Sequence, residues 1–296
     1  MIDDDSKKLI ITALITPFNS RLEVDYSEFS HLIEHQIKGN IDGILACGTT
    51  GEMPSLTIPE IIEIVNTINN IRKNLELFVG IGRNSIKETL DLGLQLDGIV
   101  DAFLIVPPCY FKPISLNGLY NYYSKIFNTV KAPIIIYNIP KYSGIQITDQ
   151  IIEKLKKYKN FIGIKDSSGD IGNSLRWATK FPELRIFIGS DALIYEGFIN
   201  GATGAISAIA NIFPEKIYKI ISEIRSNNLE SAKLAQEEVI KIRSIIKEFP
   251  NISPLKSLLH WKEITLLKSR VRPPLVDLNN EEDLKLYNKL GGYMNG

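Results

Sequence analysis

The segments PIIIY at Pro133–Tyr137 and FIGIK at Phe161–Lys165 are two short apolar runs that end in a tyrosine and a lysine. The stretch between them, Thr148–Lys157, carries isoleucine and leucine at helical spacing. Both runs are apolar almost throughout rather than at alternate positions, as is typical of parallel strands covered on both faces. This part of the chain therefore predicts a strand, a helix and a second strand parallel to the first.

Similar apolar runs recur on both sides of this unit, with helical patterns in nearly every gap. Their starts lie roughly 20 to 35 residues apart, the spacing of repeated strand and helix units. Eight such units favour an α/β fold of the closed (β/α)₈ type, the TIM barrel, over an open doubly wound sheet. The eight runs are Leu9–Ile15, Gly43–Ala46, Leu77–Gly80, Ala102–Val106, Pro133–Tyr137, Phe161–Lys165, Arg185–Ile188 and Gly204–Ile206.

The strand pattern stops after Pro214, and only helical patterns follow. They cover Glu215–Ser226, Leu229–Glu248, Pro254–Leu267 and Glu281–Leu290. Only the first of these is needed to complete the eighth unit of a barrel. We therefore expect a catalytic barrel domain at residues 1–228 and a helical C-terminal extension at residues 229–296.

Charge and composition exclude several classes of partner. The 296 residues include 34 Lys and Arg against 34 Asp and Glu, which gives a formal net charge of +0 and a pI near 6.9. A chain balanced in this way offers no basic patch to nucleic acid or to an anionic membrane surface. The long uncharged stretch at 197–214 is interrupted by Gly, Asn and Pro, which does not suit a membrane-spanning helix. We expect neither nucleic acid nor membrane as a partner.

Cysteine and histidine usage gives the expected compartment and metal content. Cys47 and Cys109 are too few for a disulfide framework, and the acidic N-terminus does not resemble a secretory signal, so a cytoplasmic location is expected. His31 and His35 share a helix face without an acidic ligand nearby, and His260 is isolated. This pattern predicts no metal site.

Lys165 is the residue that carries most information about chemistry. The active site of a (β/α)₈ barrel lies at the carboxyl ends of its strands, and Lys165 closes the sixth apolar run. At that partly desolvated place burial disfavours a charged amine, and a neutral amine attacks ketones to form a Schiff base. The alternative, on the residues alone, is a lysine that closes a strand in an ion pair with Asp166 or Asp191.

Tyr137 closes the neighbouring run, and adjacent parallel strand ends lie about 5 Å apart. A phenol there could move protons for chemistry on Lys165, with hydrogen bonds from the hydroxyls of Thr50 and Tyr110. A tyrosine that ends a strand is also often a packing residue with a solvated hydroxyl. Both interpretations remain open at this point.

Glycine-rich turns follow the second and the seventh runs and precede the eighth. The motif GTTG at Gly48–Gly51 offers hydroxyls and consecutive backbone N–H groups that suit a carboxylate, although it could be an ordinary turn with a threonine cap. Gly189–Asp191 and Gly201–Gly204 could instead hold a phosphate, as such loops do in many barrels. No basic residue accompanies them, which weakens that option.

Five motifs together resemble the dihydrodipicolinate synthase and N-acetylneuraminate lyase superfamily of pyruvate-dependent class I aldolases. They are TALITPF at Thr12–Phe18, GTTGE at Gly48–Glu52, YNIP at Tyr137–Pro140 continuing to Gly144, GIKD at Gly163–Asp166 and GSD at Gly189–Asp191. Each motif alone is weak, but the combination is specific and spans essentially the whole chain. The resemblance implies a (β/α)₈ barrel with a helical C-terminal part, usually a homotetramer made of two tight dimers.

The resemblance also implies roles for individual residues. Lys165 matches the Schiff-base lysine and Tyr137 the proton-transferring tyrosine. Thr49 and Thr50 match the pair that holds the pyruvyl carboxylate, and Thr50 with Tyr110 from an adjacent subunit matches a hydroxyl relay to Tyr137. The implied catalytic set is Lys165, Tyr137, Thr50 and Tyr110, and the implied substrate-binding set is Pro17, Thr49, Thr50, Tyr142, Asp166, Ser167, Gly189, Ser190, Asp191 and Ile206.

Departures from the family pattern suggest which member the chain resembles. Dihydrodipicolinate synthases place an arginine after the Asn-x-Pro turn, where this sequence has Tyr142, and N-acetylneuraminate lyases usually have a glutamate where Ala192 stands. The motifs at Lys165–Ser167, Gly189–Asp191 and Arg272–Pro274 look more like those of 2-keto-3-deoxygluconate aldolases. The resemblance therefore points to aldolases of Entner–Doudoroff carbohydrate metabolism.

The implied reaction is the reversible cleavage of 2-keto-3-deoxygluconate into pyruvate and glyceraldehyde by a carbon–carbon lyase. It needs no cofactor and no metal, because the imine on Lys165 is the electrophile. A dihydrodipicolinate synthase or another pyruvate-dependent keto-acid lyase is the alternative within this class. A keto-acid-binding regulatory barrel or a phosphate-binding isomerase is the alternative outside it. Acceptance of phosphorylated sugar acids depends on whether Lys112, Lys141 and Arg243 reach the barrel mouth.

Overall fold

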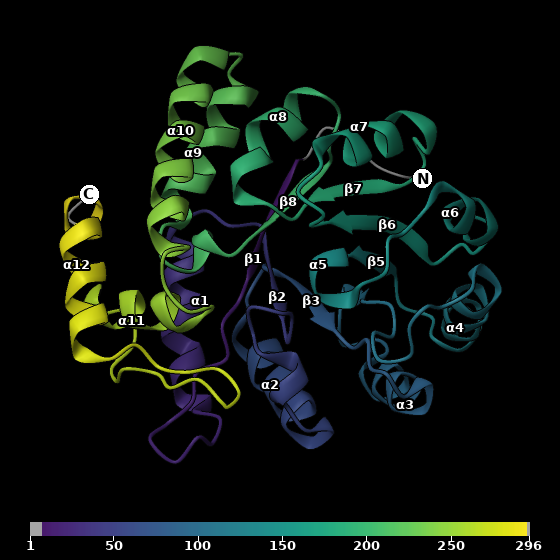
Figure 1. The fold of residues 1–296 in the computed structure, drawn as a ribbon, viewed down its shortest axis with the longest axis horizontal. Coiled ribbons are helices and arrows are strands. Elements are labelled where there is room, and N and C mark those ends of the chain that lie inside the picture. Colours follow the sequence, from purple (N-terminus) through teal and green to yellow (C-terminus); the bar gives the residue numbers. More distant parts are fainter. Residues whose placement is uncertain (1–7, 295–296) are drawn as a thin grey trace.

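The eight apolar runs form a closed barrel of parallel strands, each paired with the next in chain order and the last with the first (Figure 1). The structure is a computed structural model and describes residues 8–294. The strands are β1 (Leu9–Ala13), β2 (Gly43–Ala46), β3 (Glu76–Gly80), β4 (Ala102–Ile105), β5 (Ile134–Asn138), β6 (Phe161–Asp166), β7 (Arg185–Ile188) and β8 (Gly204–Ser207). The predicted α/β fold, a (β/α)₈ TIM barrel, is confirmed.

The barrel wall separates two hydrophobic cores. Alternate strand residues point to opposite faces, so that Ile135 and Tyr137 of β5 face the barrel interior while Ile134 packs against the surrounding helices. Inside the barrel, the rings of Phe78 and Phe187 meet edge to face with their centroids 5.9 Å apart. The interior is therefore a packed core, and a substrate can bind only at an end of the barrel.

Amphipathic helices cover the outside of the barrel (Figure 1). The helix after β2 begins with a capping box in which Thr57 and Glu60 each accept the other's backbone N–H. The helices are α1 (Phe29–Lys38), α2 (Ile58–Ile71), α3 (Ile86–Leu96), α4 (Leu116–Thr129), α5 (Pro140–Ser143), α6 (Asp149–Leu155), α7 (Ile171–Lys180), α8 (Ile194–Ile199) and α9 (Pro214–Arg225). Short 3₁₀ helices are η1 (Tyr26–Glu28), η2 (Met53–Ser55), η3 (Asp191–Leu193) and η4 (Ile209–Asn211).

Three helices follow the barrel, namely α10 (Leu229–Ile246), α11 (Ser253–Trp261) and α12 (Asn280–Met294). The first of them packs along α9 and against η3, and α12 packs on α10 and α11 at the left of Figure 1. Because α10 lies directly on barrel elements, the division of the chain at residue 229 stays a prediction. Within residues 8–294, no helix is both long and apolar enough to cross a membrane.

The helix predicted at Pro254–Leu267 is shorter than its periodic pattern, since α11 ends at Trp261. Glu263 adopts a left-handed conformation with φ 56°, which turns the chain away from the helix axis. Beyond this turn, the backbone N–H of Leu266 donates to the carboxylate of Glu28 at 3.1 Å. A contact with a distant segment thus fixes the chain where the apolar pattern alone would continue the helix.

Candidate active site

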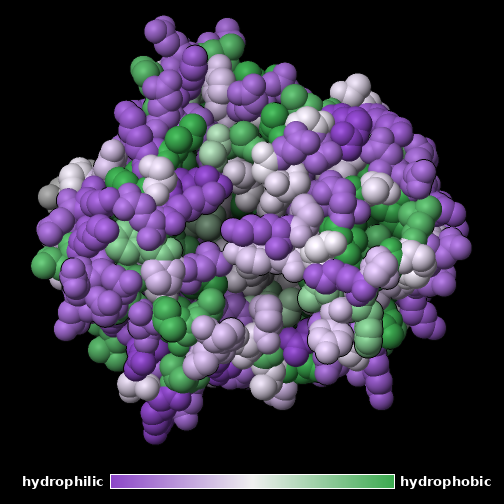
Figure 2. All heavy atoms as spheres, viewed as in Figure 1, coloured by the Kyte–Doolittle hydropathy of each residue, from purple (hydrophilic) through white to green (hydrophobic). Residues whose placement is uncertain are grey.

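A cavity of about 660 Å³ lies at the carboxyl ends of the barrel strands. Figure 2 shows a hollow near the centre of the face turned to the viewer, with hydrophilic residues around it. Nine of the residues singled out in the sequence line the cavity, namely Thr49, Thr50, Tyr137, Tyr142, Lys165, Ser167, Gly189, Asp191 and Ile206. The barrel therefore brings together residues that lie up to about half the chain apart.

Lys165 and Tyr137 form the centre of this site. The two residues are paired in the register of β5 and β6, and both are nearly buried, with exposed fractions of 4% and 5%. Lys165 Nζ lies 4.4 Å from the centroid of the Tyr137 ring. Among residues 8–294, no carboxylate forms an ion pair with Lys165. The alternative of a lysine that closes its strand in an ion pair is not realised.

The loop after β2 carries two hydroxyl groups to the cavity wall. The chain turns at Cys47, whose φ is 52°, and then places Thr49 and Thr50 against the cavity. The Thr16 hydroxyl donates to the carbonyl of Gly51 at 2.7 Å, which fixes the loop to the segment after β1. A fixed loop with two threonines beside a lysine is suited to hold a small carboxylate.

Glu52 anchors the far end of this loop in the protein interior. Its carboxylate forms an ion pair with Lys256 Nζ at 2.6 Å and accepts the backbone N–H of Arg272 at 3.0 Å. Burial lowers the pKa of Lys256 to about 8, and the Glu52 carboxylate acts in the opposite direction. Lys256 Nζ also lies 4.3 Å from the centroid of the Phe18 ring. The C-terminal segment therefore holds the loop that bears Thr49 and Thr50.

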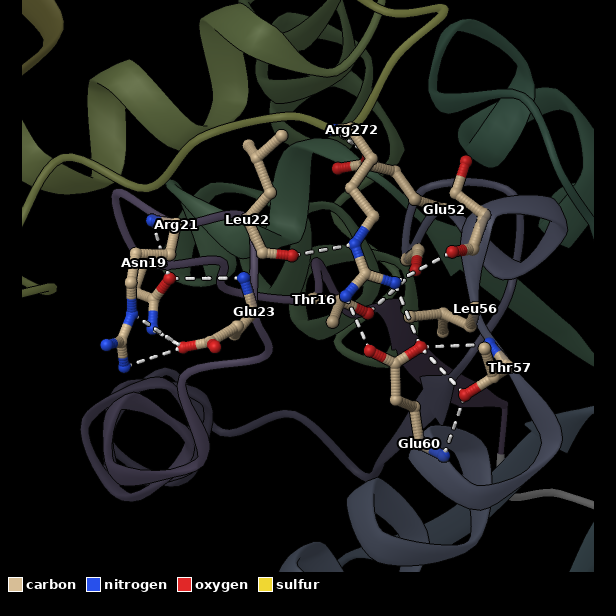
Figure 3. A network of polar contacts seen from close by, with 12 residues as sticks. Thr16, Asn19, Arg21, Leu22, Glu23, Glu52, Leu56, Thr57, Glu60 and Arg272 are labelled. Atoms are coloured by element: carbon tan, nitrogen blue, oxygen red, sulfur yellow. Dashed lines mark hydrogen bonds and ion pairs between the residues drawn. The ribbon is translucent and has the colours of Figure 1, made fainter.

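Arg272 extends this network to the start of α2 (Figure 3). Its guanidinium donates to both carboxylate oxygens of Glu60, at 2.9 and 2.5 Å, and to the carbonyl of Ser55 at 2.8 Å. The hydrogen bonds from Arg272 lower the pKa of Glu60 to about 2. Sequence reasoning named Glu52 only as the end of the GTTGE motif, without a role, and did not single out Lys256. The available signal was a lysine within the apolar pattern of a helix, because such a residue needs a buried partner.

Ser167 and Gly189 lie beside the lysine at the ends of β6 and β7. A Cβ on Gly189 would lie 2.0 Å from Ser167 Oγ and 3.1 Å from Lys165 Cε, so the close approach of these strands requires glycine. The Ser167 hydroxyl donates to the carbonyl of Gly189 at 3.3 Å. Ile206 adds an apolar patch from β8 to the same wall.

Two aspartates singled out in the sequence have different surroundings. Asp166 does not line the cavity, because its carboxylate accepts hydrogen bonds from Asn138 Nδ2 at 2.8 Å and from the Ser174 hydroxyl at 2.9 Å. Asp191 does line the cavity, and it accepts the Ser207 hydroxyl at 2.5 Å. Burial raises the pKa of Asp191. Asp166 thus braces the ends of the strands, and Asp191 faces the cavity from a buried position.

Besides Asp166, three residues implied by the resemblance do not reach the cavity within one chain. Tyr110 is 77% exposed and stacks edge to face on the exposed ring of Phe111, with centroids 5.3 Å apart. Pro17 is buried outside the cavity wall, and Ser190 does not line the cavity either. The relay expected from Thr50 through Tyr110 to Tyr137 is therefore not formed by the residues of a single chain.

Three basic residues complete the rim of the cavity. Lys141 follows β5, and Arg243 and Lys247 lie at the end of α10 and just beyond it. Lys112, which was also considered in the sequence, does not line the cavity. Lys247 was missed, although its spacing of four residues from Arg243 would have placed both side chains on one helix face.

The histidines lie apart from this site. Within residues 8–294, no group of three or more His, Cys, Asp or Glu side chains is placed to hold a metal ion. Burial, reinforced by the charge of Lys262, lowers the pKa of His35 to about 4. That ring is therefore neutral at physiological pH, as expected for a core histidine.

The fold and the site define the class of this protein, a (β/α)₈-barrel lyase that acts on carbon–carbon bonds. Comparison with known proteins gives the family. The model of the dihydrodipicolinate synthetase family matches residues 6–291, and the chain belongs to this family. Enzymes of the family use a Schiff-base lysine and no cofactor, so the expectation that no cofactor is needed rests on the family. The resemblance noted in the sequence is confirmed at the level of the superfamily.

Relatives with names of their own match along nearly the whole chain. A 4-hydroxy-tetrahydrodipicolinate synthase of Ehrlichia canis is 35% identical over 288 residues, which cover 95% of this chain and 95% of that protein. One of Hydrogenobaculum is 35% identical over 280 residues, covering 93% of this chain and 95% of that protein. Neither relative is named as a sugar-acid aldolase, which is the specificity that the sequence motifs suggested.

Solved structures show the same architecture. The 4-hydroxy-tetrahydrodipicolinate synthase of Methylacidiphilum fumariolicum is 31% identical, with a TM-score of 0.88 and coverage of 96% of this chain and 95% of that one. A dihydrodipicolinate synthase of Bacillus anthracis is 25% identical, with a TM-score of 0.90 and coverage of 98% and 99%. The arrangement of barrel and C-terminal helices is thus shared over the entire domain.

Proposed function

We propose that the chain is a pyruvate-dependent class I aldolase that acts through an imine on Lys165. One observation carries the proposal: the nearly buried Lys165 amine lies 4.4 Å from the Tyr137 ring and lines the same cavity as Thr49 and Thr50. The amine has no carboxylate partner within the described part of the chain and faces a space large enough for a keto acid. This combination supports covalent chemistry rather than a structural ion pair.

In the first half of the reaction, the Lys165 nitrogen attacks the C2 ketone of pyruvate. Loss of water replaces the C2–oxygen double bond by a C2–nitrogen double bond. The hydroxyls of Thr49 and Thr50 hold the carboxylate on one wall of the cavity. The protonated imine then accepts an electron pair from C3, so that a C3 proton leaves and an enamine forms. Attack of the enamine on an aldehyde, followed by hydrolysis, releases the product and restores the amine.

Tyr137 is the proposed proton-transfer residue. Its ring lies against Lys165, and both residues come from neighbouring strands that end at the cavity. In the cleavage direction, the Tyr137 hydroxyl gives its proton to the oxygen that leaves C2 as water when the imine forms. The resulting phenolate accepts the proton of the C4 hydroxyl while the C3–C4 bond breaks, and the phenol then returns that proton to C3 of the enamine. A rigid position beside the amine allows one group to serve these steps.

Tyr110 is assigned to the site of a second copy. Its ring is 77% exposed and protrudes from the loop after β4, where it contacts only Phe111 among aromatic residues in the described chain. A second subunit that receives this ring would complete the hydroxyl relay of Thr50 and Tyr137 implied by the resemblance. A homotetramer made of two such dimers, and a cytoplasmic location, belong to the same proposal.

The first candidate for the substrate that the enzyme cleaves is 2-keto-3-deoxygluconate. Tyr142, which lies in the cavity wall where the resembling synthases carry an arginine, supports a substrate with hydroxyl groups near that position. Its hydroxyl accepts a hydrogen bond from Asn251 Nδ2 at 2.7 Å, so the phenol is oriented. Ser167 and Asp191 offer further polar groups to distal hydroxyls.

The second candidate is the condensation of pyruvate with aspartate semialdehyde. The names of relatives that are 35% identical over nearly the whole chain favour it. Activation of pyruvate would be the same in both reactions, and only contacts with the acceptor would differ. Single polar contacts can decide such a choice by orders of magnitude.

Borohydride trapping tests the proposed function. The protein is incubated with pyruvate and borohydride and then weighed, and the modified peptide is sequenced. We expect a permanent mass increase of one reduced pyruvyl group at Lys165. A wild-type protein that binds pyruvate but stays unmodified would instead be a keto-acid-binding regulatory barrel.

A further inference from the structure

The two threonines proposed to hold the pyruvyl carboxylate belong to a tight turn that ends at Glu52. The backbone N–H of Glu52 donates to the carbonyl of Thr49 at 3.1 Å, so a single hydrogen bond closes the turn from Thr49 to Glu52. Thr49 and Thr50 line the cavity, whereas Glu52 does not. A displacement of Glu52 is therefore passed on to the two hydroxyl groups that face the substrate.

The backbone of Glu52 has a conformation that glycine adopts more easily. Its φ and ψ angles are 56° and 34°, in the left-handed region that most side chains avoid. The same loop carries glycine at Gly48 and Gly51, but not at this position. Glutamate here costs conformational free energy relative to glycine, so the reason for its presence lies in its buried side chain.

The Glu52 carboxylate is held from the C-terminal segment. One oxygen forms the ion pair with Lys256 Nζ at 2.6 Å, and the other accepts the backbone N–H of Arg272 at 3.0 Å. Lys256 Nζ in turn donates to the carbonyl of Arg270 at 2.5 Å, and the Arg272 guanidinium is fixed by Glu60 (Figure 3). Each oxygen of the carboxylate thus has a partner that is itself held in place.

A buried ion pair is a costly way to join two segments. Both charges lose their hydration, and apolar residues of similar volume often stabilise a fold as well or better. Apolar side chains can repack when a neighbour moves, however, whereas an ion pair together with a backbone N–H fixes a carboxylate in one position. Stability alone therefore does not account for Glu52 and Lys256, but the placement of the turn does.

We propose that Glu52 and Lys256 are positioning residues for pyruvate binding, which set where the hydroxyls of Thr49 and Thr50 meet the pyruvyl carboxylate. The inference rests on the proposed function, because it takes these threonines as the carboxylate site. Neither Glu52 nor Lys256 lines the cavity. The affinity for pyruvate thus depends in part on α11, which carries Lys256, while the amine of Lys165 is supplied by β6.

Borohydride trapping with two probes, pyruvate and acetone, tests the pair. Acetone offers a ketone to Lys165 but has no carboxylate for the threonines to hold. Only modification of the Lys165 peptide is counted, at low probe concentration and at a temperature at which every variant is folded. In Lys256→Met the trapping rate with pyruvate should fall about 10-fold or more, the scale of a small misplacement of positioning groups. The rate with acetone should stay within about 2-fold. Equal losses with both probes would show a general disturbance of the site and overturn the inference.

The double variant E52Q/K256M separates positioning from stability. It leaves no unpaired charge of this pair in the interior, so its Tm should exceed that of K256M. Its trapping rate with pyruvate should nevertheless stay low, because the ion pair between α11 and the turn is still missing. Recovery of that rate together with the Tm would overturn the inference. If K256M does not fold, the comparison of pyruvate with acetone is made on the double variant and decides in the same way.

Lys268→Met is the matched control. Lys268 belongs to the same C-terminal segment, but its ion pair with Asp283 at 2.5 Å joins that segment to α12 instead of to the turn. It does not line the cavity, so the variant should keep wild-type trapping rates with both probes. A selective loss with pyruvate in this control as large as that in K256M would overturn the inference. Absence of trapping from the wild-type protein would instead contradict the proposed function.

Discussion

Two lysines of this protein are buried almost equally, yet their surroundings differ in every other respect. Lys165 is 4% exposed and Lys256 is 1% exposed, and the side-chain nitrogen of each lies above an aromatic ring, 4.4 Å from the centroid of Tyr137 and 4.3 Å from that of Phe18. Lys256 pairs with the buried carboxylate of Glu52 at 2.6 Å. Lys165 faces a cavity of about 660 Å³ instead.

The comparison shows that burial alone does not make a lysine reactive. Lys256 is not available as a nucleophile, because the Glu52 carboxylate holds the proton on its amine. The carbonyl of Arg270 accepts another hydrogen bond from the same nitrogen at 2.5 Å. The amine of Lys165 has space and a phenol beside it in place of a carboxylate and a plain phenyl ring. The partner of each lysine, more than its depth, decides between structure and chemistry.

The largest expected effect comes from removal of the amine of Lys165. Lys165→Met should abolish borohydride trapping of pyruvate and lower turnover by about 10³-fold or more, because the covalent step is lost. Its free energy of unfolding should change by less than about 1 kcal/mol, since no ion pair is broken. Mass spectrometry and urea denaturation measure the two quantities. Trapping that persists in this variant would move the reactive amine elsewhere.

Lys256→Met should show the opposite pattern. It leaves the carboxylate of Glu52 buried without its partner and should cost about 3–5 kcal/mol of folding stability in urea denaturation. The folded fraction should still be trapped by pyruvate at Lys165. In the double variant with Glu52→Gln, part of the lost stability should return, because no buried charge remains. A single variant as stable as wild type would show that the pair contributes little.

Tyr137→Phe tests the difference between the two rings. The variant keeps an aromatic face above Lys165 but removes the hydroxyl, so the local environment becomes like that of Lys256 above Phe18. Imine trapping should persist, while cleavage should fall about 10²-fold, the usual scale for a positioned acid or base. Single-turnover and trapping measurements separate the two steps. Unchanged turnover would remove the phenol from the mechanism.

The smallest expected effect concerns pH and the network around Arg272. The pKa of Glu60 is lowered from 4.5 to about 2, so its pairing stabilises the fold above pH 4.5 and this contribution is lost as the pH falls toward 2. Because solvent screens the pair in part, we expect less than about 1 kcal/mol. Unfolding measured from pH 7 to pH 2 for wild type and Glu60→Gln should converge at the acid end. Parallel curves would contradict this assignment.

The barrel and the centre of the site could be predicted from the sequence because both depend on local patterns. Each strand is an apolar run, and Lys165 and Tyr137 close two consecutive runs, so the parallel register brings them together. The four-residue helix α5 was not predicted, since Pro140–Ser143 is too short to show a period.

The rest depends on contacts between segments far apart in the chain. Glu52 and Arg272 are 220 residues apart, and no local pattern pairs them. No local pattern gives the protruding position of Tyr110, because the loop after β4 follows no period; only the family resemblance implied that this side chain lies outside the cavity of its own chain. The basic residues at the rim of the cavity come from α5 (Lys141) and from the end of α10 and just beyond it (Arg243 and Lys247). Only the tertiary structure places these elements together.

The anchoring of Glu52 by residues of the C-terminal segment has a consequence for biosynthesis. During translation, the loop bearing Thr49 and Thr50 leaves the ribosome long before Lys256 and Arg272 are made. Until those residues arrive, the acid lacks its ion pair with Lys256 and the loop lacks its contacts with the C-terminal segment, so a nascent chain cannot have the finished cavity wall. Catalytic competence and complete synthesis of the polypeptide should therefore coincide in time.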